Sequence, residues 1–415
     1  MTTSTLNINA ARLNRTLAEL GRIGETPQGM MRLAYSPFDI QGREYVTGLM
    51  RQAGLEVRID PAGNVIARKP GSDPSLPAIA LGSHTDTVPN GGKYDGALGV
   101  LGAVEVARAL AENAHTLRHP LELIIFTNEE GTRFHRWLLG SRAMAGLLEA
   151  EDYDAVDDEG VGIEQRLADI GGDLSRIDQA RRYPGELAAY FELHIEQGPT
   201  LHQSGTSLGA VTGITGRFVF KVQVTGMANH AGTTPMPNRH DALAAASHLV
   251  LATQRLATVD EICRVATVGN LQVTPNAVNV VPGEVALGVE FRDVDTNSLS
   301  AAETTLRRSA AEIADANCVE ISISQVEAAR AVPMPARMQN IVAEAADQAG
   351  LQFQSLPSGA GHDAQSIAAI TEAGMVFVPS VDGISHSPNE FTLPEDCANG
   401  AQALLNMLLL ADSRM

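Results

Sequence analysis

The chain has few cysteines, little positive charge and no long apolar run, and each shortage excludes a class of protein. Its three cysteines, Cys263, Cys318 and Cys397, are widely spaced, which argues against a disulfide framework and a cysteine metal site. The net charge of −19 argues against a nucleic-acid or anionic-membrane partner, because both would require a basic face. No apolar run reaches membrane-spanning length, and the first residues lack a signal-peptide pattern. We therefore expect a cytoplasmic protein.

The length of 415 residues predicts two domains. Short apolar strands at 78–81, 121–127 and 188–195 are separated by helical segments, which is typical of an α/β fold with a mostly parallel sheet between helices. Residues 213–324 instead follow the order strand, helix, strand, strand, helix, strand, the βαββαβ order of a ferredoxin-like domain. We therefore expect a discontinuous catalytic domain of residues 1–212 and 330–415, with residues 213–329 as an inserted domain.

Side chains suited to metal binding follow the apolar strands and a late loop. They are His84, Asp95, Glu129, Glu130, His194 and His386. A single histidine or a Glu-Glu pair would ordinarily be a hydrogen-bonded or solvated group, but repeated placement at strand ends favours one shared site, because ligands bind at the carboxyl edge of such sheets. All are nitrogen or oxygen donors, which suits Zn²⁺, Mn²⁺, Co²⁺ or Ni²⁺.

The spacing of these residues also suggests their roles. Asp95 is the natural bridge between two metal ions about 3.5–4 Å apart, because the neighbouring glycines allow close approach of the backbone. Asp86 is expected to orient His84 by accepting its second ring N–H. Glu129 and Glu130 are adjacent, so one can bind metal while the other faces the metal-bound water as general base. The spacing alone does not choose between them.

Several motifs resemble those of a known family. In the family's order they are HTDTV, YDG, NEEG, ELHIEQG, NHAGTTPM, PNAVNVVPG, SGAGHDA and GISHSPNE. Together they resemble the M20 metallopeptidase superfamily, and ELHIEQG and SGAGHDA resemble its hydantoinase/carbamoylase amidase branch. That branch contains N-carbamoyl-L-amino acid hydrolases, allantoate amidohydrolases and β-ureidopropionases.

The resemblance implies two divalent metal ions per subunit, and it separates the roles of the two glutamates. Glu129 would be the base. The implied metal ligands are His84, Asp95, Glu130, His194 and His386. The inserted domain would serve as a lid and as the contact surface of a homodimer.

The resemblance also implies substrate contacts at Gln197, His230, Asn279, Arg292 and Gly361. Arg292 would hold a carboxylate in a bidentate pair, and His230 would donate to the oxyanion. Asn279 and Gln197 would offer amide groups to the carboxylate or the ureido group. Without the resemblance, Arg292 would be a surface partner of a nearby aspartate, and His230 and Gly361 would be turn residues.

The implied reaction is hydrolysis of a linear ureido C–N bond, with an N-carbamoyl-L-amino acid as the favoured substrate and allantoate as a close alternative. Arg217 could favour the more polar allantoate, whereas Phe218 and Phe220 could favour apolar side chains. A superfamily peptidase or aminoacylase would cut an amide, but His194 replaces the carboxylate usual in the peptidases. A metal-free binding module is the non-enzymatic alternative, and the intact ligands and Glu129 count against it.

Overall fold

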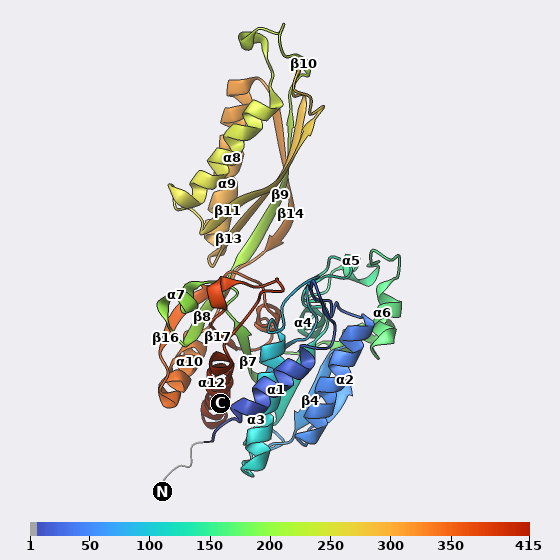
Figure 1. The fold of residues 1–415 in the computed structure, drawn as a ribbon, viewed down its shortest axis with the longest axis vertical. Helices are drawn as coiled ribbons and strands as arrows, with labels where there is room; N and C mark the ends of the chain where they lie inside the picture. The colour runs from blue at the N-terminus through green and yellow to red at the C-terminus, as the bar shows by residue number, and fades with distance from the viewer. Residues whose placement is uncertain (1–5) are drawn as a thin grey trace. The chain divides into compact units, whose positions relative to one another are not determined.

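The computed structural model describes residues 6–415, which form two compact units (Figure 1). The large unit contains Met1–Thr212 and Met334–Met415, and the inserted unit contains Gly213–Pro333. The chain remains in the inserted unit beyond β14 (Glu320–Ala329), because Val332 and Pro333 pair with Ile214 and Gly213 at the start of that unit. Within residues 6–415, none of the helices combines the length and apolar content needed to cross a membrane.

A mostly parallel sheet runs through the large unit in the order β8-β17-β7-β5-β6-β4-β3, with β16 beside β8. The four strands β17, β7, β5 and β6 are parallel, whereas β8, β4 and β3 join antiparallel. The strands are β3 (Glu56–Ile59), β4 (Val65–Lys69), β5 (Ala78–His84), β6 (Leu121–Phe126), β7 (Leu187–Ile195), β8 (Leu208–Ile214), β16 (Phe353–Ser358) and β17 (Ala373–Val378). The short pair β1 (Glu25–Thr26) and β2 (Gly29–Met30) lies outside this sheet.

Helices cover both faces of this sheet. One face packs in the main hydrophobic core against α1 (Ala10–Leu20), α2 (Pro37–Gln52), α3 (Ala97–Glu112), α10 (Ala336–Ala349) and α12 (Pro394–Arg414). Successive side chains of β7 point to opposite faces of the sheet. Phe191 and Leu193 enter the main core, whereas Glu192 contacts the start of α11 on the other face. On this second side lie α4 (Leu139–Ala145) and α11 (Asp363–Ile367), which contact each other. A smaller core includes residues of α6 (Ile163–Asp169) and of the 3₁₀ helix η1 (Leu174–Ala180).

The inserted unit has the expected βαββαβ order. Its elements are β9 (Gly216–Thr225), α8 (Ala242–Thr258), β11 (Val265–Thr274), β13 (Glu284–Asp293), α9 (Thr296–Asn317) and β14 (Glu320–Ala329). The strands form an antiparallel sheet in the order β11-β13-β9-β14, the ferredoxin-like arrangement. Strand β9 alternates, so that Phe218 and Phe220 are buried in the core of this unit while Arg217 and Val219 are only half-buried.

Candidate metal centre and active site

The parallel register of the sheet places two metal-type histidines side by side. Leu81 of β5 pairs with Phe191 of β7, and His84 and His194 each lie three residues further along their strands. Their ring centroids are 5.9 Å apart. On the other side of β5, His84 pairs with Phe126 of β6, which brings the following Glu129 to the same sheet edge.

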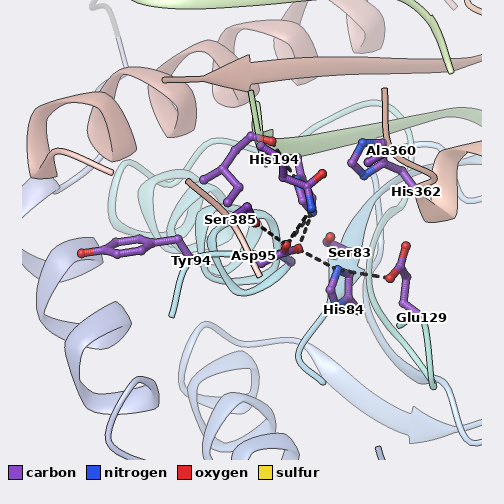
Figure 2. Close-up of polar contacts among 12 residues, drawn as sticks. Ser83, His84, Tyr94, Asp95, Glu129, His194, Ala360, His362 and Ser385 are labelled. Carbon is purple, nitrogen blue, oxygen red and sulfur yellow. Dashed lines mark hydrogen bonds and ion pairs between the residues drawn. The ribbon is translucent and has the colours of Figure 1, made fainter. Parts of the chain in front are cut away.

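Asp95 lies at the centre of the site, between the histidines (Figure 2). Its Oδ1 is 3.4 Å from Nε2 of His84 and 3.2 Å from Nε2 of His194. Its Oδ2 is 3.3 Å from Nε2 of His386, which is itself 3.6 Å from Oε2 of Glu130. Asp95 is therefore shared by two ligand groups, His84–Asp95–His194 and Asp95–Glu130–His386.

These two groups fit a pair of divalent cations. Imidazole nitrogens and carboxylate oxygens are the donors that such ions prefer, and in each group the donor atoms lie within 4.8 Å of one another. Among the described residues, the buried Oε1 of Glu130 has no hydrogen-bond partner, as expected for an atom that faces a cation. Glu129 stands beside the first group, with Oε2 3.7 Å from Nε2 of His84.

Asp86 contacts His84 through its backbone oxygen and contacts the two glutamates through its carboxylate. Oδ1 and Oδ2 of Asp86 accept hydrogen bonds from the backbone N–H groups of Glu129 and Glu130, each at 3.3 Å. Nδ1 of His84 is 3.0 Å from the backbone oxygen of Asp86 and 3.8 Å from its carboxylate. The carboxylate is therefore free to fix the turn that carries the base.

Glu390 supports Asp95 and was not identified from the sequence. It accepts hydrogen bonds from the backbone N–H groups of Tyr94 at 2.8 Å and Asp95 at 3.1 Å, and from Oγ of Ser385 at 2.9 Å. A Cβ on Gly92 would lie 2.0 Å from Cδ of Glu390, so only glycine fits there. The sequence feature that could have indicated Glu390 is its position as the last residue of the GISHSPNE motif.

Glu192 and His362 lie behind His194, and the sequence did not indicate either. Glu192 accepts from Oγ of Ser83 at 2.8 Å, from the Tyr190 hydroxyl at 3.1 Å and from the backbone N–H of Ala364 at 2.9 Å. The ring of His362 is 4.5 Å from that of His194, between centroids. Both residues occur inside recognisable motifs, ELHIEQG and SGAGHDA, which was the only signal.

Burial of several carboxylates in one place shifts their pKa values. Burial raises the pKa of Asp95, but His194 and the other facing histidines outweigh it and hold that pKa well below its ordinary value. Burial raises the pKa of Glu129 well above its ordinary value, and the nearby charge of Glu130 adds to this. Burial, followed by the charge of Asp95, raises the pKa of Glu130 to about 8. Glu129 and Glu130 therefore hold protons strongly unless a cation shares the site.

The sequence profile of Peptidase family M20/M25/M40 matches residues 80–410. The chain belongs to this family. It is 40% identical over 406 residues to the N-carbamoyl-L-amino-acid amidohydrolase of Paenarthrobacter aurescens, covering 97% of this chain and 98% of the relative. It is 33% identical over 422 residues to the allantoate deiminase of Arabidopsis thaliana, covering 94% and 80%.

Similarity to a solved structure identifies the branch of the family to which the chain belongs. The hydantoinase/carbamoylase family amidase from Burkholderia multivorans superposes with a TM-score of 0.89 at 38% identity, covering 98% of each chain. This M20 protein is therefore a member of the hydantoinase/carbamoylase amidase branch. It is a hydrolase that acts on carbon–nitrogen bonds.

Gln197 of this M20 hydrolase contacts the shared carboxylate directly. Its Nε2 donates to Oδ2 of Asp95 at 2.7 Å and lies 3.4 Å from Nε2 of His386. Its backbone has a left-handed φ of 58°, and its N–H donates to Oγ of Ser380 at 3.0 Å. Its Oε1 is buried without a hydrogen-bond partner in the described part of the chain, so an acceptor remains available beside Asp95.

The structure separates the three expected substrate residues of the inserted unit. His230, on β10 (Asn229–His230), lies beside Asn279, whose backbone oxygen accepts from Ala231 at 3.0 Å. Strand β10 pairs with β12 (Val280–Val281). In the chain, β12 lies just before the start of β13, so His230 and Asn279 lie near that end of β13. Arg292 lies near the other end of β13, about 27 Å along the strand at roughly 3.4 Å per residue. One copy of the unit therefore does not bring Arg292 to His230 and Asn279.

Arg292 forms an ion pair within its own strand. Its Nε donates to Oε1 of Glu290 at 2.7 Å. Arg217 is the direct cross-strand neighbour of Arg292, and its Nε donates to Oε2 of the same Glu290, also at 2.7 Å. The two guanidinium groups therefore share one carboxylate.

Proposed function

We propose that this M20 hydrolase cleaves the ureido C–N bond of N-carbamoyl-L-amino acids, using two divalent ions per subunit, such as Mn²⁺, Co²⁺, Ni²⁺ or Zn²⁺. The observation that carries the proposal is Asp95, one carboxylate shared by two groups of metal-type ligands, with the buried Glu129 beside them. Similarity to an N-carbamoyl-L-amino-acid amidohydrolase along nearly the whole chain supports the ureido substrate.

Glu129 is proposed as the general base. Bound metal ions would supply polarisation of the carbamoyl oxygen and a lowered pKa for the attacking water. Glu129 takes a proton from that water, which adds to the carbamoyl carbon, and later gives the proton to the nitrogen of the departing amino acid. The C–N bond breaks, and the remaining carbamate decomposes to ammonia and carbon dioxide. The hydrogen bond from the Glu129 backbone to Asp86 holds the base in position.

The proposed anchors of the substrate come from both units. Gln197 and Gly361 belong to the large unit, and Arg292 would bind the substrate carboxylate. His230 would donate to the oxyanion, with Asn279 beside it. The length of β13 separates Arg292 from His230 by more than the length of a small ureido acid. This separation supports a homodimer in which one subunit supplies Arg292 and the other supplies His230. A cytoplasmic location stays a prediction of the sequence.

Allantoate is the alternative substrate. Similarity to an allantoate deiminase favours it, and so does the pairing of Arg217 with Arg292 across β9 and β13, because a second cation suits a substrate with more polar groups. The same geometry of Asp95 and Glu129 would serve both substrates, since both carry a linear ureido group and a carboxylate.

The test is a comparison of substrates with the purified protein and added Mn²⁺. Release of ammonia would be measured for several N-carbamoyl-L-amino acids, allantoate and N-carbamoyl-β-alanine. Release of the free amino acid from an N-acetyl-L-amino acid would report amide cleavage. We expect the highest kcat/KM with an N-carbamoyl-L-amino acid. A higher value with allantoate would select the alternative, and no turnover together with no stoichiometric metal would refute both.

A further inference from the structure

Glu290 connects the proposed carboxylate anchor, Arg292, to Arg217 on one face of the inserted sheet. These three residues are half-buried, whereas Phe218 and Phe291, which alternate with them along the strands, are buried in the core of the unit. Because successive side chains of a strand point to opposite faces, the three charged residues share the face away from that core. Packing of the core therefore does not account for them.

The two arginines of this cluster stand directly opposite each other. Arg292 of β13 is the register partner of Arg217 of β9. Like charges in directly opposite positions of neighbouring strands repel and destabilise the pair. Glu290 offsets this repulsion, because its Oε1 accepts from Nε of Arg292 and its Oε2 accepts from Nε of Arg217, each at 2.7 Å. Both oxygens of one carboxylate thus hold the two guanidinium groups.

A second carboxylate holds Arg217 from the other side. Nη1 of Arg217 donates to Oε2 of Glu327, on β14, at 2.6 Å. Charges of opposite sign therefore alternate across three neighbouring strands, in the order Glu327, Arg217, Glu290 and Arg292. Burial raises the pKa of Glu290, but the hydrogen bonds from Arg292 and Arg217 outweigh it and lower that pKa below its ordinary value. A network of this kind orders its side chains better than an isolated surface ion pair does.

From this arrangement we infer that Glu290 is a positioning residue, which fixes the orientation of Arg292 and thereby sets the affinity for the substrate carboxylate. The inference rests on the proposed function and on Arg292 as the carboxylate anchor. A planar guanidinium group pairs well with a carboxylate only when the two are aligned. Ordering a long, flexible side chain during binding lowers affinity. Glu290 holds Nε of Arg292 in advance, so less of this ordering is left for the substrate to impose.

The first experiment compares two substrates that differ only in the carboxylate. N-carbamoyl-L-leucine and N-carbamoyl-L-leucinamide are given to the full-length, Mn²⁺-loaded enzyme, and release of leucine or leucinamide is measured by chromatography. Glu290→Ala should raise KM for the acid by about tenfold, with kcat and the kcat/KM for the amide changed by less than about twofold. Glu290→Gln should be intermediate, because one amide oxygen cannot accept from both arginines.

The direction of the expected change separates positioning from simple charge. Removal of a carboxylate leaves the cluster more positive, so attraction alone would lower KM for an anionic substrate. The matched control is Glu303→Ala on α9. Glu303 is also paired with an arginine, Arg307, and its side chain has the same exposed fraction as that of Glu290, 25%. We expect this control to leave KM for the acid unchanged.

A second experiment is a double-mutant cycle with Arg292→Ala. If Glu290 acts through Arg292, adding Glu290→Ala to Arg292→Ala should change KM for N-carbamoyl-L-leucine by less than about twofold. Independent effects of the two substitutions would overturn the inference. So would an unchanged or lowered KM in Glu290→Ala, or an equal loss of kcat/KM for the acid and the amide.

These outcomes concern Glu290 alone and leave the proposed function standing. An unchanged KM in Arg292→Ala would exclude the anchor, and the inference with it, while hydrolysis of ureido acids by the wild-type enzyme would still stand. A wild-type enzyme that releases ammonia from no ureido acid would overturn the proposed function, and the inference with it.

Discussion

Replacing Glu390 with alanine should loosen Asp95 and weaken metal binding without removing any metal-type ligand. Glu390 is buried, and its carboxylate accepts the backbone N–H groups of Tyr94 and Asp95 and the hydroxyl of Ser385. Alanine would leave both N–H groups buried without an acceptor and would open space beside Gly92. The loop that carries Asp95 would then lose its main support.

The size of the effect follows from these three hydrogen bonds. A hydrogen bond to a charged acceptor contributes about 1.5–3 kcal/mol, and a buried donor left unpaired costs about 1–3 kcal/mol. Because these costs overlap, we expect Glu390→Ala to lower the free energy of unfolding by about 3–5 kcal/mol. Loss of such a supporting contact typically weakens metal binding by about 10–100-fold.

Glu390→Gln is the matched control. The glutamine oxygen can still accept both backbone N–H groups, since both bind Oε1 of Glu390, and the hydroxyl of Ser385 can turn to accept from the amide. Burial, followed by the charge of Asp95, raises the pKa of Glu390, so removal of its charge costs little. We therefore expect near wild-type stability and metal affinity.

The assays are urea denaturation of the metal-free protein, which gives the free energy of unfolding, and calorimetric titration with Mn²⁺. The reasoning is refuted if Glu390→Ala matches wild type in both, because the hydrogen bonds to the loop of Asp95 would then contribute nothing. It is also refuted if Glu390→Gln is as damaged as Glu390→Ala, because the charge of Glu390 would then outweigh its hydrogen bonds.

Three further predictions concern the base, the anchor and the ligands. Glu129→Gln should bind metal as wild type does but lose about 10²–10⁴-fold in kcat, and retained turnover would exclude Glu129 as base. Arg292→Ala should raise KM for carboxylate substrates by about tenfold or more, with Arg292→Lys intermediate, and an unchanged KM would exclude the clamp. In the metal-free protein, burial raises the pKa of Glu130 to about 8, and the hydrogen bond to Asp95 raises that of His386 to about 9. Metal must displace these protons, so calorimetric affinity should rise with pH up to about 9 and then level; a flat profile would contradict this assignment.

The elements of the fold follow from local patterns, and most were predicted. The βαββαβ order of the inserted unit is as predicted. Strands β8 and β16, which pair with each other in the large sheet, were missed. Strand β16 contains a proline and one buried apolar residue, Leu356, so its local signal is weak.

The sequence by itself determined that several metal-type residues gather at one edge of the sheet. A histidine or carboxylate at the end of a buried parallel strand must lie at the carboxyl edge of the sheet, so the convergence of His84, Glu129 and His194 is a consequence of strand order. The strand ends are properties of the local chain and its periodicity.

Only the tertiary structure decided what each side chain contacts. Asp86 binds the backbone of Glu129, 43 residues away, and Glu390 binds that of Asp95, 295 residues away. Such partners depend on which strands become neighbours, and no local pattern encodes that. The separation of Arg292 from His230 has the same origin, because β10, which carries His230, pairs with β12 just before the start of β13, whereas Arg292 lies near the end of β13.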